Sequence, residues 1–186
     1  MTSKIKQAAV LVASGLLLGG CPLLGPNTTA PAKKPPAPDY QAAVTTPTPP
    51  AAKIRAICYN DADLAVIRER MLQQELTVAT LQCQTPNGAR AFSATYNTFI
   101  KKFSSDLRSN AQALNELSRR KRFNVDTLVT EFANRTAQRA PVDKEFCSRS
   151  LRALEWALDS KVSSLDQAPP PYDLGPEMNI HPCPAK

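Results

Sequence analysis

Apolar residues recur at helical spacing in the central part of the chain. After residue 61 they recur every three or four positions, a pattern that is typical of an amphipathic helix; they are Leu64, Ile67, Met71, Leu72, Leu76, Val78 and Leu81. Asp61 and Asp63 suit the N-cap and the first turn of a helix. The turn motif Thr-Pro-Asn-Gly at residues 85–88 closes the segment. The pattern therefore predicts a first helix that begins near residue 61 and ends before residue 85.

Three further helices follow in the same pattern. Residues 91–121 carry an apolar stripe without Gly or Pro, which predicts one long helix. Residues 104–106, Ser-Ser-Asp, offer a break point, because these side chains compete for backbone hydrogen bonds. Asn124 can cap a third helix, and a fourth carries apolar residues over 146–162. No segment alternates with a period of two, so the chain is expected to be all-α, an up-down bundle of about four helices joined by short connections.

Proline divides the 186-residue chain into three parts. The 17 prolines are concentrated before residue 51 and after residue 168, and only Pro86 and Pro141 lie between. This distribution predicts a helical domain at residues 53–165 between two proline-rich, disordered segments, a linker at 21–52 and a tail at 166–186. A polyproline-like linker of this length would reach roughly 90 Å.

The first 20 residues have the form of a secretory signal peptide. Lys4 and Lys6 precede an apolar run at residues 8–18, and small residues follow it. The run is shorter than the roughly 20 apolar residues that span a bilayer. The chain is therefore expected to be exported.

A lipid attachment motif closes this segment. Leu18-Gly19-Gly20-Cys21 resembles the lipobox of bacterial lipoproteins. The resemblance implies cleavage before Cys21, a diacylglyceryl group on its sulfur and an acyl chain such as palmitate on its amine. Three acyl chains exceed the two that stable anchoring needs. Pro22 stands where an Asp would favour the inner membrane, so we expect the outer membrane, facing the periplasm; an unlipidated signal peptide with a chance cysteine is the alternative.

The other four cysteines are expected to form two disulfides, because the number is even and the protein is exported. A helix of about 20 residues separates Cys58 from Cys83 by roughly 30 Å, far beyond the 7 Å that a disulfide allows. In an up-down bundle Cys83 meets Cys147 at one end. Cys58 meets Cys183 at the other, which fastens the tail to the domain. A metal site is disfavoured, because the spacing contains no CxxC pair and no companion His.

Catalytic motifs are lacking. The single histidine, His181, lies in the tail, so a Ser-His or Cys-His pair has no base in the helical domain. A wall hydrolase that uses two carboxylates is the enzyme alternative; its candidates are Glu69, Glu75, Glu116 and Glu131. Solvated helix faces are the favoured explanation of these residues, because Glu is mostly exposed in proteins. Trp156 is expected to fill the core or a groove. No cofactor is expected besides the lipid on Cys21.

Positive charge points to an acidic partner. Residues 53–165 contain 18 basic and 12 acidic side chains, and Arg119, Arg120, Lys121 and Arg122 form a compact basic run. Such a run suits a helix C-terminus, which prefers cations. It also fits an acidic surface: lipid headgroups, peptidoglycan carboxylates or an acidic envelope protein. Nucleic acid is excluded as a partner of an exported, tethered protein.

Two resemblances concern the domain as a whole. The segment 75–83, together with 96–103 and Phe146-Cys147, resembles a group of small exported helical proteins of alphaproteobacteria, from which no functional residue transfers. In architecture, a lipid-anchored, disulfide-bonded helical domain is similar to secretin pilotins. We therefore expect a non-enzymatic binding or scaffold module of the cell envelope, with a wall hydrolase or a pilotin-like assembly factor as alternatives.

Overall fold

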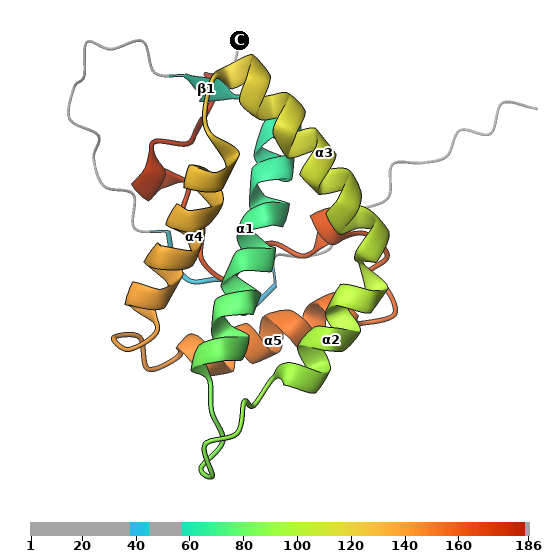
Figure 1. The fold of residues 1–186 in the computed structure, drawn as a ribbon, viewed down its shortest axis with the longest axis vertical. Coiled ribbons are helices and arrows are strands. Elements are labelled where there is room, and N and C mark those ends of the chain that lie inside the picture. Colours follow the sequence, from blue (N-terminus) through green and yellow to red (C-terminus); the bar gives the residue numbers. More distant parts are fainter. Residues whose placement is uncertain (1–37, 45–56, 185–186) are drawn as a thin grey trace, which may run out of the picture. The chain divides into compact units, whose positions relative to one another are not determined.

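A computed structural model describes residues 38–44 and 57–184 of the chain. Cys21, the predicted signal peptide and most of the predicted linker lie outside these residues. The described part is predominantly helical, which confirms the all-α class (Figure 1). Its elements are β1 (Cys58–Tyr59), α1 (Asp61–Gln82), α2 (Ser93–Lys102), α3 (Ser104–Lys121), α4 (Val125–Arg139), α5 (Phe146–Leu158), the 3-10 turns η1 (Leu165–Gln167) and η2 (Pro176–Met178), and β2 (His181–Pro182).

Helix α1 is the central element. Its N-cap is Asn60, one residue before the predicted cap, and the side chain of Asn60 accepts a hydrogen bond from the amide of Asp63 at 2.8 Å. Apolar residues surround the axis, and Met71, Leu72 and Leu76 are fully buried. A helix with apolar residues all round requires cover on every side. Helices α3, α4 and α5 and the chain after α5 supply it.

The predicted long helix over residues 91–121 is two helices. α2 ends at Lys102 and α3 begins at Ser104, so the break falls at Phe103, just before the expected residues 104–106. Phe103 is buried, and its ring lies 5.3 Å from that of Phe99. The bend lets α2 pack against α5 while α3 packs against α1. A straight helix would present one apolar stripe to only one of these partners.

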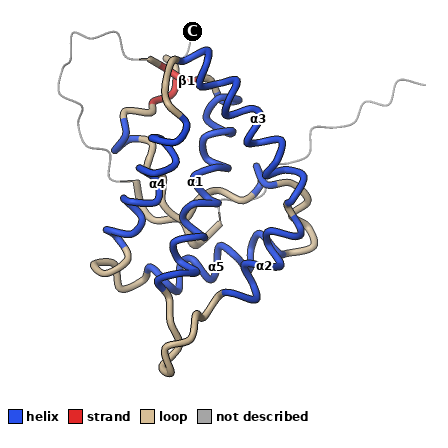
Figure 2. The backbone as a smooth tube through the Cα atoms, viewed as in Figure 1, coloured by secondary structure: helices blue, strands red, loops and turns tan. Residues whose placement is uncertain are grey.

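Helix α5 departs from the up-down order. In Figures 1 and 2, α1, α3 and α4 follow the long axis, whereas α5 lies across their lower end beside α2. It ends at Leu158, before the predicted limit at 162. Lys102 of α2 donates from its ammonium to the carbonyls of Ala157 and Asp159, both at 2.8 Å, and so caps this end. The place of a fourth upright helix is taken by the tail.

The proline-rich tail, which was expected to be disordered, is packed into the core. Its buried apolar residues include Ala168, Tyr172, Leu174 and Ile180, and Leu165, the last residue of the predicted domain, is buried directly before it. It passes behind α1 from the side of α3 to that of α4 (Figure 1, orange to red). Side chains of the helices satisfy amides of Leu165 and of the tail: Leu165 donates to Asp106 at 2.9 Å, and Tyr172 donates to Glu75 at 3.2 Å. Proline prevents helix formation but not burial, because it needs no hydrogen-bond acceptor for its own nitrogen.

Part of the predicted linker also belongs to the folded unit. Tyr40 is fully buried, and its hydroxyl donates to the carbonyl of Pro169 at 2.9 Å. The amide of Ala42 donates to Pro171 at 2.9 Å. Trp156 is half-buried and packs edge-on against Tyr40 at 6.3 Å between ring centroids. Residues 38–44 thus form a strap over the tail, and the folded unit starts before the predicted boundary at residue 53.

Both predicted disulfides are present. Cys58 pairs with Cys183, and Cys83 pairs with Cys147, across sequence separations of 125 and 64 residues. The first joins the two short parallel strands, in which Cys58 lies opposite His181. The second joins the end of α1 to the start of α5. Each bond therefore lies at one end of α1, as predicted, although it is the tail and not an upright fourth helix that carries the chain to Cys183.

Candidate functional site

The predicted basic run is split by the fold. Arg120 donates to the carboxylate of Asp63 at 2.7 Å, and Lys121 donates to the carbonyl of Cys58 at 2.7 Å. Lys121 also lies 3.5 Å from Asp63 and 5.3 Å from the ring centre of Tyr59. The side chain of Asp63 is only 5% exposed, so these cations neutralise a buried carboxylate. Arg120 and Lys121 hold the end of α3 against the start of α1.

The outer residues of the run face solvent. Arg119 and Arg122 are exposed, and neither makes an ion pair with the residues that the structure describes. Arg122 caps α3 in the left-handed conformation, with φ of 60° and ψ of 48°, and so turns the chain toward α4. Arg119 and Arg122 are thus the two cations of the run without an ion pair in the described residues, whereas Arg120 pairs with Asp63 although 60% of its side chain is exposed.

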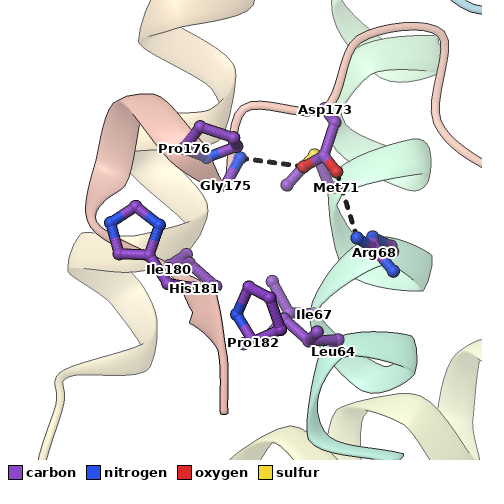
Figure 3. A pocket seen from close by; sticks show the side chains of 10 residues that line it. All are labelled: Leu64, Ile67, Arg68, Met71, Asp173, Gly175, Pro176, Ile180, His181 and Pro182. Atoms are coloured by element: carbon purple, nitrogen blue, oxygen red, sulfur yellow. Dashed lines mark hydrogen bonds and ion pairs between the residues drawn. The ribbon is translucent and has the colours of Figure 1, made fainter. Parts of the chain in front are cut away.

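A small hollow lies between α1 and the tail (Figure 3). Its volume is about 130 Å³, and it is lined by Leu64, Ile67, Arg68, Met71, Asp173, Gly175, Pro176, Ile180, His181 and Pro182. Arg68 and Asp173 form an ion pair of 3.2 Å at its edge. The volume is below the roughly 300–1,000 Å³ of usual ligand pockets. It suits a single side chain or a fragment of a few atoms.

The four candidate carboxylates have separate surroundings. Glu75 is buried beneath the tail, where one oxygen accepts the amide of Tyr172 and the other has no hydrogen-bond partner in the described part of the chain. Burial raises the pKa of Glu75 well above its usual range, and Asp173 and Glu177 act in the same direction. Glu131 pairs with Arg135 at 3.4 Å on α4, and Glu116 is exposed on α3.

Glu69 has carboxylate neighbours that sequence analysis missed. It accepts a hydrogen bond from Asn110 at 3.0 Å. Burial raises the pKa of Glu69, the bond from Asn110 opposes this, and the nearby charges of Asp166 and Asp106 add to the increase. A spacing rule could not have found these residues, because they come from α1, α3 and η1. Glu69 and Glu75 are the two candidates with a raised pKa and neighbouring carboxylates, and of these only Glu69 is partly exposed, so it is the one that a substrate could reach.

An aromatic clamp holds the middle of the tail and was also missed. The ring of Tyr172 stacks on Phe146 at 6.0 Å, and the guanidinium of Arg139 lies 4.6 Å from the centre of the Tyr172 ring. The Tyr172 hydroxyl donates to Asp143 at 2.7 Å, which lowers the pKa of that carboxyl. Arg149 adds a second cation at 5.7 Å and donates to the carbonyl of Tyr40 at 2.9 Å. The clamp fastens tail, strap and α5 together, and its aromatic and charged groups therefore have structural partners.

Two further observations bear on the predicted sites. Within residues 38–44 and 57–184, no three His, Cys, Asp or Glu side chains are placed to share a metal ion. None of the described helices combines the length and the apolar character that a membrane crossing requires. Cys21 lies outside the described residues, so its lipidation stays a prediction.

Comparisons with known proteins identify no relative of the chain. Scans of family models, curated proteins and solved structures find no match to the chain.

Proposed function

We propose that the chain is a lipid-anchored protein of the bacterial envelope, held at the outer membrane through Cys21 and facing the periplasm. Its disulfide-bonded helical unit acts without catalysis, as a binding or scaffold module. One observation carries the proposal: every cysteine except Cys21 is paired in a disulfide. Stable disulfides are typical of exported proteins, and the remaining cysteine is the one that the lipobox motif would acylate.

The fold suits a binding module. The strap, the tail and two disulfides fasten the unit from both of its chain ends, so its surface is presented as a rigid body. Rigid presentation lowers the entropy cost of association. The partner is an envelope component, either the membrane surface, peptidoglycan or an envelope protein, as in a pilotin-like assembly factor.

The anchor is tested by acyl labelling in cells. Cys21→Ser should abolish incorporation of a palmitate analogue and release the protein from the membrane fraction. The double variant Cys58→Ser with Cys183→Ser is the matched control: it also removes thiol chemistry but should keep the label. A Cys21→Ser protein that still carries lipid would disprove the anchor.

A wall hydrolase is the second candidate, and one observation favours it. Glu69 is half-buried, its burial raises its pKa, and the nearby carboxylates of Asp166 and Asp106 act in the same direction, so several carboxyl groups lie near one another as a glycosidase requires. The measurement is muropeptide release from peptidoglycan by the purified protein. Release that Glu69→Gln abolishes would replace the binding proposal with the enzyme.

A further inference from the structure

The exposed side of α3 carries a continuous polar row. Arg108, Gln112, Asn115 and Arg119 follow one another at spacings of four, three and four residues, which places them on one face of the helix. All four are exposed. Arg122 follows three residues later as the helix cap. The opposite face buries Asn110, Leu114 and Leu117 against the core. We call the five exposed residues the α3 strip.

The strip is cationic and lacks acidic partners. The ion pairs of the described residues use Arg68, Arg120, Lys121, Arg135 and Arg139, and none uses Arg108, Arg119 or Arg122. Glu116 is an exposed acid of α3 that lies about 80° around the helix from Arg108 and only three residues before Arg119. In the described part of the chain its carboxylate forms no ion pair with either arginine. Basic and acidic residues nearly balance over 57–184. The positive strip is therefore a local feature and not a consequence of overall charge.

We infer that the α3 strip contacts anionic phospholipid headgroups, an inference that rests on the lipid anchor proposed above. Guanidinium groups bind phosphate oxygens in a bidentate manner, and the side-chain amide of Gln112 can donate to the same kind of acceptor. The amide of Asn115 already donates one hydrogen to the carbonyl of Ala111 at 3.0 Å. Mobile lipid headgroups can arrange themselves along a convex helix surface and need no preformed pocket, unlike a glycan or a peptide.

The strip lacks the apolar side chains that would insert into a bilayer. Its contact with the membrane is therefore peripheral and electrostatic. Arg108 and Arg119 are separated by 11 residues, about 16 Å along the axis, which exceeds the screening length of about 8 Å at physiological salt. The arginines thus act nearly independently. Each cation near an anionic surface is worth roughly fivefold in partitioning, so the three together contribute roughly 100-fold.

Weak attraction of this size is sufficient for an anchored protein. An acyl anchor confines the domain to the vicinity of the bilayer, so the second contact forms at a high effective concentration. Contact through the strip would orient the anchored domain with α3 toward the membrane. The strap and the tail would then be turned toward other envelope components.

Vesicle partitioning of the mature chain with Cys21→Ser tests the strip apart from the anchor. The vesicles are phosphatidylcholine alone or with one third phosphatidylglycerol. The strip variant is Arg108→Gln, Arg119→Gln and Arg122→Gln. The control variant is Arg90→Gln, Lys144→Gln and Lys161→Gln, which removes the same charge from exposed side chains off the strip. Circular dichroism checks that both variants remain folded.

The expected result is binding to anionic vesicles only, with a loss of roughly 100-fold in the strip variant and less than fivefold in the control. High salt should abolish the difference. Equal losses in both variants, equal binding to neutral vesicles, or strip-dependent binding to peptidoglycan but not to vesicles would each overturn the inference. Acyl labelling in cells reports separately on the anchor: labelled protein whose strip ignores anionic vesicles leaves the proposed function standing and removes only this inference.

Discussion

Tyr40 links the strap to the domain, and replacing it should loosen both. Tyr40→Phe removes the hydrogen bond of 2.9 Å from the hydroxyl to Pro169 and keeps the ring. A typical net contribution of about 1 kcal/mol is expected to be lost. Tyr40→Ala also removes a ring that is 0% exposed and contacts Trp156. Large-to-small substitutions of this kind in a core cost about 3–5 kcal/mol.

The strap can also respond to the loss of Tyr40 by detaching from the domain, because it is a short segment. Once the cost of losing Tyr40 exceeds the free energy that docks residues 38–44, the strap detaches while the helices stay folded. The loss in global stability then levels off at the docking free energy. Two measurements separate the steps: urea unfolding reports the helices, and hydrogen exchange at Ala42, whose amide donates to Pro171, reports the strap.

The two Tyr40 variants should differ in how much stability and how much strap protection they lose. Tyr40→Phe should keep the protection of Ala42 and lose about 1 kcal/mol, whereas Tyr40→Ala should lose the protection entirely. The fluorescence of Trp156 should change in the alanine variant, since its edge contact with the ring disappears. If Tyr40→Ala leaves both unfolding and the exchange of Ala42 at the wild-type values, the strap contributes nothing, and the assignment of residues 38–44 to the folded unit is wrong.

Two further predictions concern buried charge. Burial raises the pKa of Glu75, so the folded state holds its proton after the unfolded state has lost it, and stability should fall as pH rises above the usual carboxyl range near 4.5. Glu75→Gln should flatten this slope in urea unfolding between pH 5 and pH 8; an unchanged slope would contradict the assignment. Arg120→Gln with Lys121→Gln leaves the carboxylate of Asp63 buried without its cations and should cost about 1–3 kcal/mol, less than a fully buried pair because the side chain of Arg120 is 60% exposed. Replacing Arg119 and Arg122, which form no ion pair in the described residues, should cost within about 0.5 kcal/mol in thermal unfolding, and equal losses in the two pairs would show that the run is not divided as described.

Local pattern sufficed for the helices and the disulfides. The apolar spacing after residue 61 and the cap at Asn124 are properties of neighbouring residues, and the structure contains both helices there. The length of one helix excluded a bond between Cys58 and Cys83, because a rigid rod of known rise keeps its ends apart. The choice of Cys58–Cys183 with Cys83–Cys147 also required an assumed up-down order of the helices, and the structure contains both bonds. The lipobox at Cys21 is likewise a short-range motif, and it stays a prediction.

Contacts between distant segments decided the remainder. The break at Phe103 arises because α2 and α3 serve different partners. The burial of Tyr40 and Tyr172 could not be predicted from the proline-rich composition of their segments. Composition indicates whether a segment tends to form a helix, but it does not show that the helices leave an apolar surface which such a segment can cover.

The functional surfaces depend on the same long-range contacts. Four consecutive cations are alike in sequence, yet two of them pair with the carboxylate of Asp63, and Arg119 and Arg122 form no ion pair with the described residues. The carboxylates around Glu69 come from separate elements. The charge of a side chain is a property of the sequence. Its partner depends on how elements that lie far apart along the chain pack together, and only the tertiary structure determines that packing.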